Sequence, residues 1–212
     1  MFRLILASTA AHRRELLARL GLPFDAVAPA FTELAPPEAP RSIREVEDLV
    51  LANARGKAES LRGSHPDALI LAADQLCECD GRIFGKPGSS ERAIEQLTFL
   101  TGKTHRLHNG VVLLDARSGR WEEELVRAEL TLRPLDAGQI RRYVERERPW
   151  HSAGSYLSER LGIALFGHLQ VEDPTAIIGL PLIAVTRLLG RFGVDPLNFD
   201  AAPATIATEP TA

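Results

Sequence analysis

Short apolar runs alternate along the chain with helix-spaced apolar residues, a pattern that predicts alternating strands and helices. Residues 4–7 form an apolar run that predicts a buried first strand. Residues 10–20 follow with helix-forming side chains and an apolar face of leucines. Ser42 and Glu45 then stand at the capping-box spacing for a helix over residues 42–61. The first third of the chain is therefore expected to contain one strand and two helices.

The middle of the chain predicts a buried strand that stops at an acidic residue. Residues 69–73 form a continuous apolar run of the kind found in strands covered on both faces, and Asp74 follows directly. We therefore expect the strand to end there, with a carboxylate at its end. Asp80 and Gly81 then predict a hairpin turn, and residues 90–100 predict a helix.

The rest of the chain continues the alternation that is typical of an α/β fold. Beyond Gly193 the sequence is rich in Ala, Pro and Thr and has too little apolar area to stay ordered. We see no repeats and no interdomain linker, and expect one domain over residues 1–198 with a flexible tail over residues 199–212. The other expected elements are strands at residues 106–114 and 123–132, a turn at Ser118-Gly119, a helix capped by Asp136, and a helix over residues 182–192.

The composition suits a globular domain with no strong affinity for polyanions. The chain has 212 residues, of which 45% are hydrophobic and 25% charged, and its formal net charge is −3. Such a chain lacks the overall basic field that holds proteins on nucleic acid or on anionic membranes, so we expect neither as a partner. Any anionic substrate must instead meet a local cluster of Lys and Arg.

The cysteines and the apolar run near the N-terminus indicate the cellular compartment of the protein. Cys77 and Cys79 are separated by one residue, which is too close for an ordinary disulfide or a CxxC metal site. The apolar run at residues 2–7 is too short for a secretory signal or a membrane span. We therefore expect a cytoplasmic protein. Trp121 and Trp150 are both expected to pack in the core.

Hydroxyl and guanidinium groups follow the first predicted strand. Ser8 and Thr9 end the strand, and Arg13 and Arg14 fall in the first turns of the next helix. Hydroxyls, helix-terminal amides and two cations at one place form a plausible phosphate cradle. The alternative is that the two arginines form an ordinary solvated helix face.

Two further positions are candidates for chemistry. Asp74 follows an apolar strand, and ligands of α/β sheets bind beyond strand ends, although aspartate there is also a common turn former. Residues 81–87 contain Lys86 between a glycine and a proline, which holds a cation on a rigid turn but also suits a surface lysine. The segment is one residue short of a P-loop and has proline where Ser or Thr must contact magnesium.

Taken together, Ser-Thr-x-x-His-Arg-Arg after the first strand, Ala-Asp-Gln after the buried strand, and Gly-Lys-Pro resemble the Maf family of nucleotide pyrophosphatases. The combination is specific although each part alone is weak. The matching segments cover nearly the whole chain: residues 4–17, Glu33, residues 54–58, Asp74-Gln75, residues 85–87, residues 153–155 and residues 178–181.

The resemblance implies a two-lobed α/β fold, with a central twisted mixed sheet flanked by helices and a deep cleft, related in shape to the inosine triphosphate pyrophosphatases. It implies hydrolysis of a nucleoside triphosphate between the α and β phosphates, with Mg²⁺ or Mn²⁺ as cofactor, and a homodimer. The alternative for Lys57 is that it is an exposed residue of an ordinary helix. Carried over by position, the catalytic carboxylate is Asp74, the metal is held by Glu33 and Asp74, and the phosphates are bound by Ser8, Arg13, Arg14, Lys57 and Lys86.

Within the family the chain looks like the branch assigned to 7-methyl-GTP, because Gln75 follows the aspartate and Glu159 stands where another branch has glutamine. A carboxylate can accept from N1–H and the 2-amino group of guanine, and it favours the positive charge of the N7-methylated base. His12 departs from the tryptophan common in that branch, and Arg160 and residues 10–11 also depart from the family pattern. His12 and Glu159 could also be ordinary exposed residues. The alternatives are a dTTP or UTP pyrophosphatase and a nucleotide-binding regulator of cell division.

Overall fold

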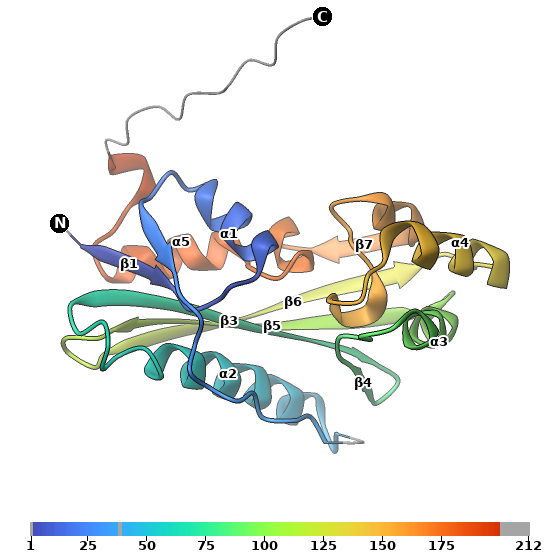
Figure 1. The fold of residues 1–212 in the computed structure, drawn as a ribbon, viewed down its shortest axis with the longest axis horizontal. Helices are drawn as coiled ribbons and strands as arrows, with labels where there is room; N and C mark the ends of the chain where they lie inside the picture. Colours follow the sequence, from blue (N-terminus) through green and yellow to red (C-terminus); the bar gives the residue numbers. More distant parts are fainter. Residues whose placement is uncertain (1, 38–39, 200–212) are drawn as a thin grey trace, which may run out of the picture.

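The computed structural model describes residues 2–37 and 40–199, and within them the chain forms a seven-stranded mixed sheet (Figure 1). The strand order is β2-β1-β3-β5-β6-β7, with β4 paired to β3. The strands are β1 Arg3–Leu6, β2 Phe24–Ala26, β3 Ala68–Cys79, β4 Arg82–Phe84, β5 Thr104–Asp115, β6 Trp121–Leu132 and β7 Phe166–Val171. The α-helices are α1 Ala11–Ala18, α2 Ile43–Glu59, α3 Ser90–Leu100, α4 Ala137–Glu147 and α5 Leu182–Arg191. The 3₁₀ turns are η1 Ala153–Ser155, η2 Leu161–Leu165, η3 Pro174–Ile177 and η4 Pro196–Asn198.

The sheet changes from parallel to antiparallel at β3. β1 pairs in parallel with both β2 and β3, whereas β3, β5, β6 and β7 pair in antiparallel order. The helices α1 and α2 connect the parallel strands, because a parallel pair needs a long crossover connection. The long strands β5 and β6 need only a tight turn. The α/β fold with a mixed sheet is therefore confirmed.

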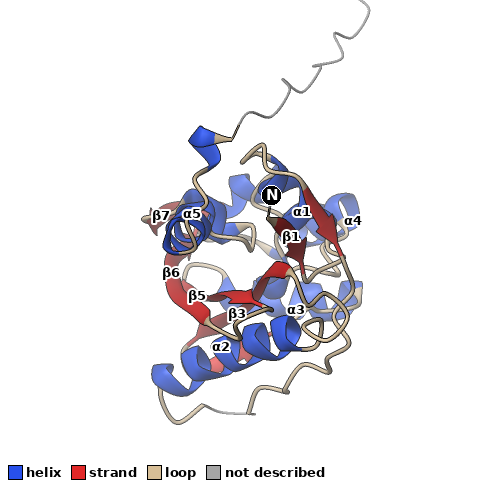
Figure 2. Cartoon of the chain, turned by 90° about the vertical axis from the view of Figure 1, so that its left-hand side faces the viewer, coloured by secondary structure: helices blue, strands red, loops and turns tan. Residues whose placement is uncertain are grey.

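Helices cover both faces of the sheet (Figure 2). Helix α2 packs against one face, where apolar residues of β3 and β5 such as Ile70 and Val112 meet Ala54 and Ala58. The opposite face carries two separate apolar clusters, one under α1 and α5 and one under α3 and α4. Division of the core on this face gives the two-lobed arrangement that the resemblance implied. None of the described helices combines the length and the apolar character needed to span a membrane.

Most local predictions are confirmed. Helix α3 has the predicted bounds, Asp136 caps α4 by accepting from Gln139 N, and Asp80-Gly81 forms the two-residue turn between β3 and β4. Ser42 caps α2 by accepting from Glu45 N, but the Glu45 carboxylate accepts from Arg41 N and not from Ser42 N. The predicted capping box is therefore only half formed.

Other predictions were wrong. Trp121 is 46% exposed and not in the core, because it begins β6 at the rim of the sheet. The end of the chain is ordered further than its composition suggested, since Val194 is buried and Phe199 packs edge-on against Phe2. Except for Phe199, the tail expected over residues 199–212 lies outside the described residues. Strands β2 and β7 are short and were not predicted.

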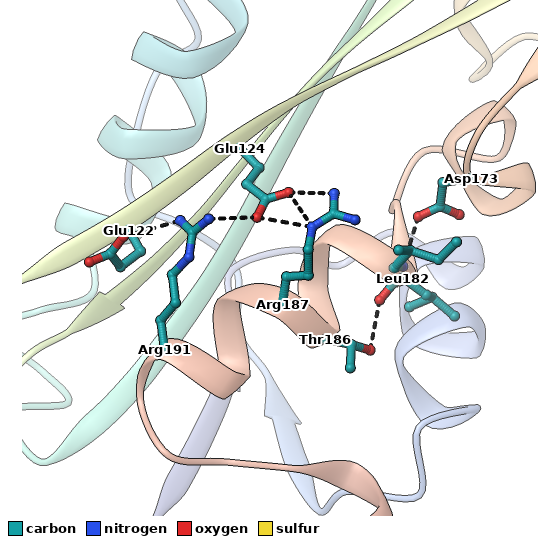
Figure 3. A network of polar contacts seen from close by, with 8 residues as sticks. Glu122, Glu124, Asp173, Leu182, Thr186, Arg187 and Arg191 are labelled. Carbon is teal, nitrogen blue, oxygen red and sulfur yellow. Dashed lines mark hydrogen bonds and ion pairs between the residues drawn. The ribbon is translucent and has the colours of Figure 1, made fainter.

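Glu124 on β6 joins helix α5 to the sheet (Figure 3). Its Oε2 accepts from Arg187 Nη2 at 2.6 Å, and its Oε1 accepts from Arg191 Nη2 at 3.1 Å. Arg191 Nη1 also reaches Glu122 Oε2 at 3.1 Å. The two arginines lie one helical turn apart on α5, so one side of the helix is tied to one strand.

We expect Glu124→Gln to lower the free energy of unfolding by about 1 kcal/mol, because the amide keeps the shape of the side chain but weakens its charge-assisted hydrogen bonds. Urea denaturation measures the change. The control is Arg117→Gln, which breaks an ion pair with Asp67 whose side chains are 76% and 74% exposed, and it should change the stability very little. Equal effects of the two variants would contradict a role for Glu124 in holding α5.

Candidate active site

Asp74 lies inside β3, so the prediction that the strand ends there was wrong. Parallel pairing of β3 with β1 ends at the Leu6–Leu71 register, but antiparallel pairing with β5 continues through Asp74–Gly110 and beyond. Asp74 therefore lies just past the C-terminal end of β1, where β3 loses one of its two neighbours. The apolar run ends at this point because the sheet opens to a polar cluster, while the strand itself continues.

Two polar side chains of helix α2 contact the buried carboxylate of Asp74, and a third, Glu33 of the loop before the helix, contacts one of them. Lys57 Nζ donates to Asp74 Oδ1 at 2.7 Å and lies 2.6 Å from Glu33 Oε1. Asn53 Nδ2 donates to Asp74 Oδ2 at 3.0 Å. Asn53 and Lys57 are one turn apart on α2, so both point from one helix face to the sheet. Lys57 is only 4% exposed, which rules out its reading as an exposed helix position.

Arg13 brings a second cation to this cluster. Its Nε donates to the Gly179 carbonyl oxygen at 3.0 Å, and no hydrogen bond within the described residues uses its two Nη atoms. Burial lowers the pKa of Arg13, whereas the charges of Asp74 and Glu33 act to raise it. Arg13 is half-buried, which contradicts the alternative interpretation that it belongs to a solvated helix face. Its terminal nitrogens are available to an anion.

The loop residue Glu33 is ionised by its cationic neighbours. Burial acts to raise the pKa of Glu33, but the hydrogen bond from Lys57 and the charges of Lys57, Lys86 and Arg13 lower it overall. Lys86 itself is exposed and follows β4 on the predicted turn. The structure thus brings Arg13 and Lys57 into the electrostatic surroundings of Asp74, and places Glu33 beside Lys57 with the charge of Lys86 acting on it.

Ser8 and Arg14 take different positions at the start of α1. Ser8 is 5% exposed, and its Oγ accepts from Ala10 N at 3.2 Å, so the hydroxyl shapes the turn that leads from β1 into the helix. Arg14 is exposed, and no hydrogen bond or ion pair of the described residues links it to Asp74. Ser8 therefore shapes the start of α1, and the role of Arg14 in phosphate binding stays a prediction.

Two of the three predicted specificity residues, His12 and Gln75, both lie near Gly179. A Cβ added at Gly179, whose φ is +118°, would lie 3.5 Å from His12 Nε2 and 3.6 Å from Gln75 Oε1. Gln75 Nε2 donates to Asn109 Oδ1 at 3.0 Å and to the Ala176 carbonyl at 2.8 Å. Burial, together with the charges of Arg13 and Lys86, lowers the pKa of His12 to about 4. His12 is therefore a neutral imidazole at physiological pH.

Glu159 is the third predicted specificity residue, and no hydrogen bond or ion pair joins it to His12 or Gln75 among the described residues. Its side chain is exposed in the segment between η1 and η2. Burial raises the pKa of Tyr143, and the charges of Glu147 and Glu159 add to this shift. No hydrogen bond or ion pair in the described part of the chain joins Glu159 to the Asp74 cluster. Its neighbour Arg160 lies 3.9 Å from Glu147.

The predicted deep cleft is not evident at Asp74. Two surface cavities of about 590 and 630 Å³ lie elsewhere. The first borders β6, β7 and α5, and the second borders β4 and α3. Neither is lined by Asp74 or by its partners, and the first is surrounded by arginines that are already ion-paired. The chemistry of the Asp74 cluster therefore identifies the candidate site better than cavity size.

Asn53 and Gly179 are parts of this site that sequence reasoning did not single out. Asn53 carried a usable signal, because it is a polar residue four positions before Lys57 on the face of α2 that packs on the sheet. Gly179 contributes its backbone carbonyl, which no side-chain pattern reports. In the sequence analysis Gly179 appeared only as one residue of the Maf-like segment 178–181.

The arrangement of carboxylates bears on metal binding. Within residues 2–37 and 40–199 no group of three or more His, Cys, Asp and Glu side chains is placed to hold a metal ion. Two carboxylates, Asp74 and Glu33, flank the ammonium group of Lys57. This set suits an ion such as Mg²⁺, which commonly takes only one or two protein carboxylates and completes its shell with phosphate and water.

The chain matches known proteins over nearly its whole length. A family model described as Maf-like protein matches residues 3–192. A 7-methyl-GTP pyrophosphatase of Cupriavidus pinatubonensis is 42% identical over 191 residues, which are 90% of this chain and 94% of that protein. A 7-methyl-GTP pyrophosphatase of Bordetella pertussis is 43% identical over 92% of this chain and 95% of its own length. One of Pseudomonas aeruginosa is 42% identical over 91% and 97%.

Among solved structures, that of the Staphylococcus aureus Ham1 protein covers 90% of this chain and 97% of its own. The sequence identity is 14% and the TM-score is 0.42, a likeness too weak to bear on the function.

Proposed function

Because this chain belongs to the Maf family, we propose that it hydrolyses a nucleoside triphosphate between the α and β phosphates, releasing the monophosphate and pyrophosphate. The observation that carries the proposal is the buried carboxylate of Asp74, which pairs with Lys57 and lies in the field of Arg13, while Lys57 also pairs with Glu33. In-line attack of water on a phosphoanhydride spreads negative charge over the non-bridging and leaving oxygens. A preorganised set of cations beside one carboxylate is suited to stabilise that charge.

Each residue has a role that follows from its position. Asp74 orients the attacking water and accepts its proton, because it is the buried acceptor at the centre of the cluster. Arg13 offers its two Nη nitrogens, and Lys86 its exposed ammonium, to the triphosphate and the departing pyrophosphate. Lys57 neutralises the pair of carboxylates and holds them in place. Ser8 shapes the start of α1, where backbone amides favour an anion.

A divalent cation, Mg²⁺ or Mn²⁺, is part of the proposal. Asp74 and Glu33 would hold it, since carboxylate and phosphate oxygens suit both ions. When bound, such an ion supplies Lewis-acid stabilisation of phosphate oxygens and lowers the pKa of a bound water.

The proposed substrate is 7-methyl-GTP, the compound named in the relatives at 42 to 43% identity. His12 and Gln75 both lie near Gly179, whose carbonyl accepts from Arg13, and would contact the base. An imidazole that stays neutral can lie against a cationic purine without charge repulsion. Glu159 would add a carboxylate to the recognition of the base from its exposed position between η1 and η2.

The decisive experiment incubates the pure protein with Mg²⁺ and a panel of ordinary and methylated nucleoside triphosphates. We expect release of pyrophosphate, with 7-methyl-GTP showing the highest kcat/KM. Orthophosphate as the first product would overturn the proposed cleavage position. Preference for dTTP or UTP would reject the assignment of the base. Tight triphosphate binding without metal-dependent turnover would instead support a nucleotide-binding regulator.

Glu159→Gln tests the assignment of the base directly. We expect the ratio of kcat/KM for 7-methyl-GTP to that for GTP to fall about tenfold, because an amide lacks the negative charge that favours the methylated base. Glu145→Gln, on the exposed face of α4, serves as the matched control and should leave the ratio unchanged. An unchanged ratio in Glu159→Gln would remove this residue from base recognition.

A further inference from the structure

The carboxylate of Glu33 reaches the site on a segment without regular structure. Residues 27–37 form neither helix nor strand, and the Glu33 side chain is 51% exposed. Glu33 Oε1 nevertheless lies 2.6 Å from Lys57 Nζ. A long irregular segment has many conformations available, so something must hold this part of it against the sheet.

Helix α2 holds the segment through the backbone of the next residue. Asn53 Oδ1 accepts from Leu34 N at 2.8 Å, and Asn53 Nδ2 lies 3.4 Å from the Leu34 carbonyl oxygen. The same Nδ2 donates to Asp74 Oδ2 at 3.0 Å. One amide side chain therefore joins the loop backbone beside Glu33 to the carboxylate of Asp74. Asn53 is 2% exposed, so its bond to Asp74 is buried, whereas its bonds to the Leu34 backbone are partly buried.

A second contact lies one turn along the same helix. The ring of Phe31 packs against Gly56, where an added Cβ would come within 2.2 Å of it. Gly56 and Lys57 are three and four positions after Asn53, so all three lie on one side of α2. This side of the helix meets loop residues 31, 33 and 34 in turn. The loop is therefore seated along α2, and Asn53 provides its hydrogen-bonded anchor.

We infer that Asn53 is a positioning residue for the proposed hydrolysis, which fixes the spacing of Glu33 and Asp74 by bonding to both the Leu34 backbone and the Asp74 carboxylate. Asparagine suits this role because it offers an acceptor and two donors on one short side chain. An aspartate would lack the donor for Asp74, and leucine would lack both functions. The catalytic consequence of this inference depends on the proposed function, but the anchoring of the loop does not.

Asn53→Leu tests both parts. We expect hydrogen exchange of the Leu34 amide to become at least about tenfold faster, because its buried acceptor is lost. We expect kcat for pyrophosphate release to fall by about 10²-fold while KM changes little, because small misplacements of reacting groups act mainly on the chemical step. The Mg²⁺ concentration for half-maximal turnover should rise.

Asn53→Asp separates the two bonds. Its carboxylate can still accept from Leu34 N, so the Leu34 amide should stay protected, whereas the loss of the donor to Asp74 should still lower kcat. The matched control is Glu47→Gln, which alters another buried polar residue of α2 that contacts Arg127 and His108. This control should lower the melting temperature without changing Leu34 exchange or kcat per folded molecule.

The outcomes decide between the claims. Unchanged Leu34 exchange in Asn53→Leu would overturn the anchoring, and a kcat loss no greater than that of Glu47→Gln would overturn the positioning role. If Asn53→Leu does not fold, a wild-type kcat in Asn53→Asp would be enough to reject the role. Absence of turnover in the wild-type protein would reject the proposed function instead, and Leu34 exchange would still test the anchor.

Discussion

Asp74→Asn is expected to reduce pyrophosphate release by about 10³-fold or more while leaving the fold intact, because the amide can neither accept the proton of the attacking water nor hold a cation as a carboxylate does. The substitution keeps the size of the side chain. In the unsubstituted protein Lys57 Nζ donates to Asp74 Oδ1 at 2.7 Å, and the amide oxygen of asparagine can still accept this hydrogen bond. A steady-state assay with Mg²⁺ and the preferred triphosphate measures the loss. A melting curve confirms that the protein is folded.

Glu78→Gln is the matched control for this prediction. Glu78 lies on the same face of β3 as Asp74, is equally buried at 6% exposed, and accepts from Gly81 N at 2.8 Å. It lies toward the hairpin end of the strand, away from Lys57. We expect the control to retain turnover, and activity of Asp74→Asn within tenfold of the wild type would exclude Asp74 as the catalytic carboxylate.

Lys57→Met should reduce turnover by about 10²-fold or more and also destabilise the protein. The ammonium group lies between Asp74 and Glu33, and its removal leaves two carboxylates facing each other with less compensation. Breaking a buried ion pair by removing one partner costs about 3 kcal/mol of unfolding free energy. Urea denaturation at pH 7 measures this cost, and added Mg²⁺ should restore part of it, because the proposed ion binds the same carboxylates.

The effect on stability should depend on pH in a defined direction. Burial acts to raise the pKa of Glu33, but Lys57, Lys86 and Arg13 lower it overall, so its ionisation stabilises the folded state above its ordinary pKa of 4.5. That contribution is lost as the pH falls through the lowered pKa. The difference in stability between the wild type and Lys57→Met should therefore be largest near pH 7 and narrow below about 4.5.

Lys103→Met provides the comparison for Lys57→Met. Lys103 pairs at 3.0 Å with Asp80, which lies in the turn between β3 and β4, but the Lys103 side chain is 40% exposed. Its loss should cost less than about 1 kcal/mol and leave turnover unchanged. Equal destabilisation by the two variants would contradict the bridging position of Lys57.

Local sequence patterns, such as helix caps and turn residues, were enough to predict most of the helices and strands. Helix α3 was predicted with its observed bounds, and the turn at Asp80-Gly81 was predicted because both residues tolerate the positive φ that such a turn needs. Asp136 was recognised as a helix cap. These features depend on interactions within a few residues of chain, and such interactions are present in the sequence itself.

The sequence also supplied the chemistry of the candidate site, through the Maf-like motifs. Family membership is confirmed over residues 3–192. The proximity of Arg13, Glu33, Lys57 and Lys86 to Asp74 was an expectation from the motifs. The structure pairs Lys57 with both Asp74 and Glu33 and places Arg13 in the field of the two carboxylates, whereas the charge of Lys86 acts on Glu33. The roles of individual residues, including Arg14 and Glu159, stay predictions that the proposed variants and assays can test.

The sequence by itself determined many of the local elements, the family and the kinds of group in the candidate site. Only the tertiary structure decided that Asp74 lies within β3, because the length of a strand depends on its partner β5, which follows far along the chain. It also decided that Asn53 joins Leu34 to Asp74. Pairing and anchoring of this kind bring distant residues together, and their energy comes from contacts that exist only once the chain has folded.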